Sequence, residues 1–163
     1  HNSLGNSYFL HWLEERLSGR RAFASQFVFQ ISETDALIAQ HHLITFCEVI
    51  EKLGCKLSLS NFGCTPKPLR YLSLVPAAYV KLDTGLLRKI DVNQAKLKFL
   101  SALIEELHKK GIRVIAPMLE QLPMLPLLWR ANVDFMQGNC LHPTSTSMSF
   151  EFIQTQTVNF DFC

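Results

Sequence analysis

Short apolar stretches alternate with amphipathic stretches along the 163-residue chain, and this alternation constrains the fold more than any other feature. Apolar, β-rich runs predict strands at Phe27–Ile31, Lys56–Ser60, Tyr79–Leu82, Arg113–Ala116 and Val133–Met136, with a sixth candidate at Met148–Ile153. Because the strands are separated by helical segments rather than tight turns, neighbouring strands are expected to run parallel. The sequence therefore predicts a parallel sheet built from βα units.

The helical segments follow from the spacing of apolar residues. Residues at intervals of three and four predict long helices at Tyr8–Leu17, Thr34–Leu53 and Asn93–Lys110, and shorter ones at Leu69–Leu74 and Pro123–Arg130. Two architectures consist of such units, an open doubly wound sheet and a closed TIM-type barrel. No Gly-x-Gly-x-x-Gly motif follows the first strand, so a dinucleotide-binding sheet is unsupported. A complete barrel has eight strands, and the predicted strands amount to about three quarters of one.

Composition narrows the class of protein. The net charge is only +2 and the lysines and arginines are scattered, so nucleic acid is not an expected partner. No run of about 18 apolar residues is present to form a membrane segment. The cysteines number five and include no Cys-x-x-Cys pair, which fits a reduced compartment and argues against zinc. We therefore expect a cytoplasmic globular domain.

The fold class indicates where functional residues should lie. In a βα barrel, they occupy the carboxyl ends of the strands and the loops that follow. Those positions carry Gln30, Ser60, Asn61, Lys81, Asp83, Pro117, Glu120 and Gln137. Lys81 interrupts an apolar strand, which favours a role in binding, whereas Asp83 favours capping of the next helix. Gln30 fits a binding site or a cap of its strand end, and Glu120 fits a binding site or a cap of the helix that starts near Leu122. Gln137 with Gly138 favours a plain turn over a binding role.

These positions are polar but poor in carboxylates. Phosphodiester hydrolysis by two metal ions requires several acids, which hold the cations and activate water. Only Asp83 and Glu120 lie at such positions, with Glu33 just past the first strand. This set makes no convincing two-metal centre, so we expect no metal and no cofactor.

Five short motifs follow one another along nearly the whole chain: Phe29–Glu33, Leu59–Gly63, Val80–Asp83, Val114–Glu120 and Gln137–Gly138. In this order they resemble EAL domains, the family of cyclic-di-GMP phosphodiesterases. The resemblance implies an α/β fold, a TIM-like (β/α) barrel of the EAL type that is incomplete here and lacks its first strands. Residues 1–163 would then form the C-terminal part of a single domain. The Glu-Ala-Leu segment itself and the family's metal-binding Asn would lie upstream of His1.

The departures from the family concern its metal-binding acids. Active members carry Glu at the positions of Gln30 and Pro117, and paired Asp at the positions of Ser60 and Asn61. The family's lysine, second glutamate and glutamine persist as Lys81, Glu120 and Gln137. The resemblance therefore implies a degenerate phosphodiesterase that is not an enzyme.

The segments Trp129–Gly138 and Met148–Phe152 are similar to those of FimX-type inactive receptors, which bind cyclic-di-GMP and act in type IV pilus assembly and twitching motility. LapD-type and CsrD-type regulators are also similar. By this resemblance, Leu119 would pack on a guanine and Glu120 would contact the edge of the base. The residues expected to complete the site are Lys81, Gln30, Asn61 and Gln137. Because leucine offers no π-stacking, affinity is expected to be lower than with an aromatic side chain.

Two other functions stay open. One is a protein-interaction domain that binds no nucleotide and contacts a PilZ-type adaptor, a sister domain or a second copy. The other is a residual enzyme in which acids upstream of His1 hold one metal ion. A barrel without two adjacent strands has two open sheet edges. We therefore expect that a partner chain fills the gap, as in a homodimer, that another part of the protein fills it, or that the helix Tyr8–Leu17 shields it.

Overall fold

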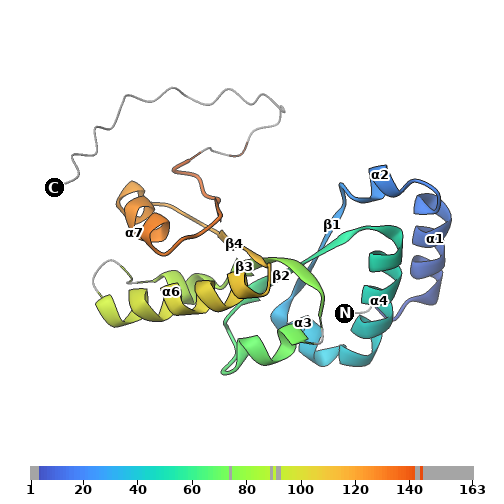
Figure 1. Cartoon of the computed structure of the whole chain (residues 1–163), viewed down its shortest axis with the longest axis horizontal. Helices are drawn as coiled ribbons and strands as arrows, with labels where there is room; N and C mark the ends of the chain where they lie inside the picture. Colours follow the sequence, from blue (N-terminus) through green and yellow to red (C-terminus); the bar gives the residue numbers. More distant parts are fainter. Residues whose placement is uncertain (1–3, 74, 89, 91–92, 142–143, 145–163) are drawn as a thin grey trace.

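The computed structural model describes residues 4–73, 75–88, 90, 93–141 and 144. A single parallel sheet contains, in sequence order, β1 Val28–Ser32, β2 Lys56–Phe62, β3 Ala77–Leu82, β4 Arg113–Ala116 and β5 Phe135–Met136. Every neighbouring pair is parallel, which confirms the expectation from the helical connections. Among the described residues, β1 and β5 each pair on one side only, so the sheet has two open edges (Figure 1). The candidate sixth strand, Met148–Ile153, lies outside these residues.

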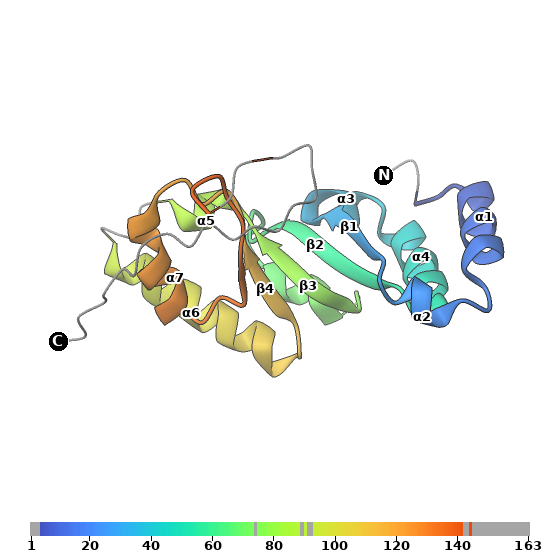
Figure 2. The same ribbon diagram turned by 90° about the horizontal axis from the view of Figure 1, so that it is seen from above.

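The connections between strands are helical. They are α1 Ser7–Leu17 and α2 Arg21–Ala24 before β1; α3 Glu33–Ile38 and α4 Gln40–Leu53 before β2; the 3-10 helix η1 Pro68–Ser73 before β3; α5 Thr84–Leu87 and α6 Gln94–Lys109 before β4; and the 3-10 helix η2 Leu122–Met124 with α7 Leu125–Arg130 before β5. In Figures 1 and 2, α1, α2 and α4 gather beside β1, whereas α6 and α7 lie at the β4 side of the sheet. None of the described helices combines the length and the apolar character that crossing a membrane requires.

Three sequence expectations differ from the structure. The long helix predicted over Thr34–Leu53 is two helices, separated at Ala39, whose φ of −102° and ψ of 30° are not helical. The helix predicted over Pro123–Arg130 begins as a 3-10 turn that contains a proline near its start. The last strand is shorter than Val133–Met136, because the N–H of Val133 donates to the carbonyl of Leu128 instead of to a neighbouring strand.

One face of the sheet packs on helices and forms the core. Val80 and Leu82 of β3 are 0% and 1% exposed, and Lys81 between them points to the opposite face because successive strand side chains alternate. Leu57 and Leu59 repeat the pattern in β2. Each such large apolar side chain stabilises the fold by about 1.5–3 kcal/mol. The alternation therefore places Lys81 on the face of the sheet opposite to the core.

Side-chain caps fix the helix ends next to β3. The Asp83 carboxylate accepts a hydrogen bond from the Gly85 N–H at 2.8 Å and begins α5, as its position in the sequence predicted. Asn93 caps α6 in the same way, through the N–H of Lys96 at 3.0 Å. Gly54 ends α4 with a φ of 87°, a left-handed conformation that glycine adopts without steric cost.

Candidate functional site

The carboxyl ends of the strands border a hollow of about 460 Å³, which we call the mouth. Five of the six residues expected to bind a ligand line it together: Gln30, Asn61, Lys81, Glu120 and Gln137. Ser60, Pro117 and Met118 are also in its wall. The parallel register explains this convergence, because it brings the ends of all the strands to the same edge of the sheet.

A bulge in β2 places two polar residues at the mouth. The pairing of β2 with β3 passes from Leu59 opposite Val80 to Phe62 opposite Leu82, so β2 holds one extra residue at this point. Asn61 has a φ of 52°, a left-handed conformation that asparagine tolerates better than most residues. The bulge lets Ser60 and Asn61 line the mouth and still returns Phe62 to the core.

Glu33 holds the loop that follows β2. Its side chain is 1% exposed. Oε2 accepts hydrogen bonds from the N–H groups of Gly63 at 2.9 Å and Cys64 at 3.1 Å. Oε1 accepts a hydrogen bond from the Thr65 hydroxyl at 2.6 Å. The carboxylate that the sequence offered as an additional acid is therefore occupied by residues 63–65, as a buried charge requires.

The loop after β4 is clamped against β5. The N–H of Gln137 donates to the carbonyl of Ala116, and the N–H of Leu119 donates to the carbonyl of Gln137, both at 2.9 Å. Gly138 lies so close to Leu119 that a Cβ at position 138 would collide with the Leu119 backbone. Met118 within this loop has a φ of 52°, which is rare for a residue with a long side chain.

The contacts between the loop after β4 and residues 137–138 determine which apolar side chain of that loop is accessible. Leu119, which was expected to pack on a base, is 1% exposed and belongs to the wall of a second hollow of about 450 Å³. Met118 is 66% exposed and borders both hollows. The accessible apolar surface at this point therefore belongs to Met118 rather than to Leu119. The sequence carried no sign of this difference, because it depends on one left-handed backbone conformation.

The polar side chains of the mouth are available to a ligand. Within the described part of the chain, Gln30, Lys81, Glu120 and Gln137 make no side-chain hydrogen bond or ion pair. Of the described residues that line the mouth, Glu120 supplies the carboxylate and Lys81 the ammonium group. Nowhere in the described ranges do three or more His, Cys, Asp or Glu residues form a metal-binding group. This donor set does not fit a pair of divalent cations, which prefer several carboxylate oxygens.

Comparison with known proteins agrees with this architecture. The family model described as "EAL domain" matches residues 1–144. The chain is 26% identical over 110 residues to the cyclic di-GMP phosphodiesterase PdeB of Shewanella oneidensis, an alignment that covers 68% of this chain and 13% of that protein. The chain therefore spans a small part of the length of this curated relative.

Solved structures match a larger share of this chain than the curated relative does. The crystal structure of the FimX EAL domain from Pseudomonas aeruginosa bound to c-di-GMP superposes with a TM-score of 0.85 and 29% identity, over 93% of this chain and 62% of that chain. The FimX EAL domain of Xanthomonas citri, in complex with c-diGMP, gives a TM-score of 0.83 over 93% of this chain and 60% of that chain; at 21% identity it supports the fold alone. The expected α/β fold of the EAL type is thus confirmed, and the chain belongs to the EAL domain family.

Proposed function

We propose that residues 1–163 are the C-terminal part of a single degenerate EAL domain that binds cyclic-di-GMP as a receptor and does not hydrolyse it. The observation that carries the proposal is the mouth, where polar side chains without intramolecular partners surround a hollow that includes one carboxylate among its described residues. It is supported by the FimX relative at 29% identity, whose structure is described as bound to c-di-GMP.

The chemistry of the mouth suits this ligand. Cyclic-di-GMP carries two anionic phosphodiesters, which the ammonium group of Lys81 attracts. The amide side chains of Gln30, Asn61 and Gln137 can donate to phosphate or ribose oxygens. Glu120 accepts hydrogen bonds only, so it suits the N1–H and amino donors of guanine.

Binding without hydrolysis follows from the same residues. Gln30, Ser60 and Asn61 are neutral, and Pro117 offers no side-chain ligand. Glu33 is occupied by the loop after β2. This part of the domain therefore lacks the carboxylate ligands that would hold water-activating cations. By extension, the protein would act in bacterial signal transduction in the cytoplasm, including control of type IV pili, twitching motility and biofilms.

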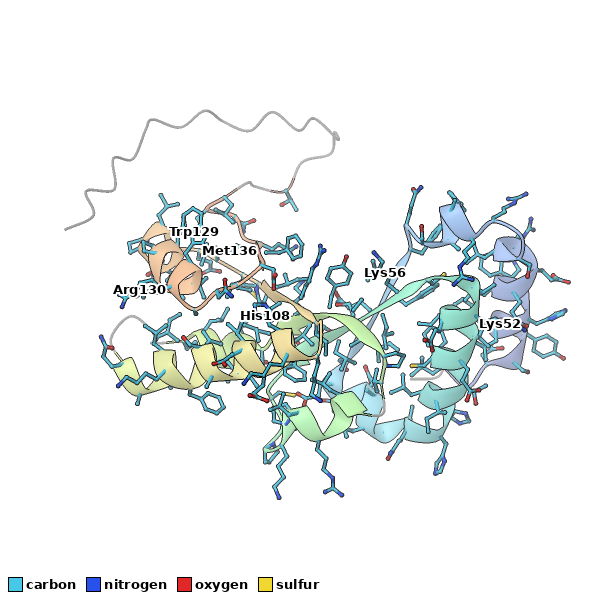
Figure 3. All side chains as sticks on the ribbon, viewed as in Figure 1. Lys52, Lys56, His108, Trp129, Arg130 and Met136 are labelled. Carbon is cyan, nitrogen blue, oxygen red and sulfur yellow. The ribbon has the colours of Figure 1, made fainter. Side chains whose placement is uncertain are left out.

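A second function, a protein-interaction module, is favoured by the uncovered face of the sheet. Val28 and Phe135 are exposed on the two edge strands. On the same face, the rings of Tyr79 and Phe135 lie 6.2 Å apart. The side-chain Nζ of Lys56, which is labelled in Figure 3, lies 5.9 Å from the centre of the Tyr79 ring. A PilZ-type adaptor or a second copy of the chain would be the partner.

Isothermal titration of cyclic-di-GMP with and without Mg²⁺ or Ca²⁺ separates these functions. We expect binding at about micromolar Kd or tighter, unchanged by chelator. Glu120→Ala and Lys81→Met should weaken it at least about tenfold, given that a charged hydrogen bond contributes about 1.5–3 kcal/mol. The matched controls are Glu48→Ala and Lys98→Met, at exposed positions outside the mouth. If a folded sample releases no heat on titration, the receptor proposal fails and the protein-interaction function is the one supported. Metal-dependent hydrolysis of cyclic-di-GMP would contradict the proposed loss of catalysis.

A further inference from the structure

A third hollow lies beside α4, apart from the mouth. It has a volume of about 310 Å³ and runs between α4 and the segment that leads from η1 to β3. We call it the α4 groove, and its described lining residues are Ile44, Cys47, Glu48, Glu51, Leu72, Val75 and Pro76. None of these residues borders the mouth. The α4 groove is therefore a separate surface from the site of the proposed nucleotide.

The unequal lengths of two neighbouring helices leave the groove open. The helix α4 has 14 residues and spans about 21 Å, whereas the 3-10 helix η1 has 6 residues and spans about 12 Å. The helix α1 also packs on α4 (Figure 1), but it contributes no residue to the groove. Ile44, Cys47 and Glu51 follow one another at intervals of three and four and therefore form one stripe along α4. Within the described part of the chain, η1 is too short to cover this stripe.

The floor of the α4 groove is apolar. Cys47, Leu72 and Val75 are 3%, 7% and 5% exposed, so they form the bottom of the groove. Ile44 is 42% exposed and stands at its edge. Ile44 and Val75 also border a small apolar cavity of about 10 Å³, which is about the space of one water molecule. This void gives Ile44 room to shift when an apolar side chain enters the groove from outside.

Two carboxylates stand on the rim. Glu48 and Glu51 are exposed, and their side chains make no ion pair or hydrogen bond within the described residues. Burial, followed by the charges of Glu51 and Glu48, raises the pKa of the Cys47 thiol to about 11, so both carboxylates act on the floor of the groove. The described lining residues include no lysine or arginine, although the whole chain has a net charge of +2. The groove is therefore a locally anionic surface on a chain that is not acidic.

An apolar floor with an acidic rim selects its partner by chemistry. In helix-in-groove recognition, one apolar stripe of the partner helix enters the groove, and charged residues at the edges set its orientation. The stripe from Ile44 to Glu51 spans about 10 Å, which is the length of two helical turns. Nucleic acid and anionic lipid are disfavoured, because their phosphates would be repelled by Glu48 and Glu51. A basic amphipathic helix satisfies both the floor and the rim.

We propose that the α4 groove binds a short amphipathic helix of a partner protein, whose apolar side chains contact Ile44, Leu72 and Val75 and whose lysine or arginine side chains pair with Glu48 and Glu51. This interaction does not require cyclic-di-GMP, and it uses a different surface from the uncovered face of the sheet. Because the ion pairs are exposed, binding weakens as the salt concentration rises.

The probe is a pair of fluorescein-labelled peptides of about 14 residues, or four helical turns. Both carry leucine at every third and fourth position, and the remaining positions are lysine in one peptide and glutamate in the other. Fluorescence anisotropy at low salt measures their binding to the full 163-residue chain. We expect the lysine peptide to bind and the glutamate peptide not to bind.

Charge reversal tests the rim. Glu48→Lys combined with Glu51→Lys should weaken binding of the lysine peptide about tenfold, because two exposed ion pairs are replaced by like charges. The same variant should gain binding of the glutamate peptide. Glu105→Lys combined with Glu106→Lys changes the net charge equally on α6, outside the groove, and should leave the affinity within about twofold. Ile44→Ser should weaken the lysine peptide without a change of charge.

The outcomes decide the proposal. If the lysine peptide does not bind the folded chain, or if the α6 variant weakens it as much as the groove variant does, the proposal is overturned. The second result would show a general attraction of cationic peptides. A reversed preference in the groove variant alone supports the proposal. Titration of cyclic-di-GMP tests the receptor separately, so the two proposals fail independently, and thermal unfolding confirms that each variant is folded.

Discussion

The Nε2 atom of His108 lies 2.8 Å from Oδ2 of Asp134, and the same carboxylate oxygen accepts the N–H of Val114 at 2.7 Å. These contacts join the last turn of α6, where Figure 3 labels His108, to the start of β4 and the turn before β5, at the amino ends of these strands. Partial burial by itself raises the pKa of Asp134, but the hydrogen bonds from Val114 and His108, with the charges of His108 and Arg113, hold the pKa below its ordinary value of 3.8.

Replacing Asp134 by Asn should lower the free energy of unfolding at neutral pH by about 1 kcal/mol, the usual contribution of a partly exposed hydrogen bond. Because folding lowers the pKa, the carboxylate stabilises the fold above about pH 4, and this contribution is lost as the pH falls through the lowered pKa. Urea unfolding across pH 2–7 should therefore show that the free energy of unfolding falls more steeply toward acid pH for the wild-type chain than for the variant. If the two profiles of unfolding free energy against pH ran parallel, the ionised Asp134 carboxylate would not stabilise the fold. Glu48→Gln, at an exposed site, is the control.

Glu33→Ala should destabilise the chain by about 3 kcal/mol, because two backbone N–H groups and one hydroxyl lose a buried charged acceptor. Hydrogen exchange at Gly63 and Cys64 should accelerate more than exchange in β4. Glu51→Ala, on the exposed side of α4, provides the comparison. Unchanged exchange in residues 63–65 would show that the loop does not depend on this carboxylate.

Gly138→Ala and Gly111→Ala form a matched pair. Gly111 has a φ of 72° with no atom within 4 Å of an added Cβ, so its substitution should cost only the left-handed conformation, about 1–2 kcal/mol. At Gly138 an added Cβ meets the Leu119 backbone, so the cost should exceed about 2 kcal/mol. It should also weaken ligand binding, since the loop that carries Met118 must move. Equal melting temperatures for the two variants would show that the close approach of Gly138 to the Leu119 backbone does not constrain the fold.

Cys47 should resist alkylation in the folded chain. Burial, followed by the charges of Glu51 and Glu48, raises the pKa of its thiol to about 11, so little thiolate is present near pH 8. Cys64 is exposed and should react with iodoacetamide before Cys47, although burial raises the pKa of the Cys64 thiol as well. Peptide mapping by mass spectrometry would locate the labels, and in urea both cysteines should react at similar rates. Fast native labelling of Cys47 would show that α4 opens readily.

The sequence predicted the strands and the composition of the mouth because both depend on local patterns. Apolar alternation fixes which face of a strand is buried, as at Val80, Lys81 and Leu82. Parallel order then brings the carboxyl ends together without further information. These two rules were sufficient to place Gln30, Asn61, Lys81, Glu120 and Gln137 around one hollow.

The remaining features depend on tertiary contacts that no local pattern encodes. Nothing in the residues around Ala39 resembles a usual helix stop, yet the helix breaks there. The use of Glu33 as an acceptor depends on a loop 30 residues further along the chain. Met118 is accessible and Leu119 is buried, contrary to the expected packing of Leu119 on a base. This difference depends on the contact between Gly138 and the loop after β4.

The buried carboxylate of Glu33 has a consequence for recognition. The loop that it holds follows directly from Asn61 and Phe62, so the β2 wall of the mouth is rigid before any ligand arrives. A ligand that enters loses little free energy to ordering that segment, and even a modest set of polar contacts can then produce useful affinity. The affinity would accordingly depend on the stiffness of the wall as well as on the number of groups that touch the ligand.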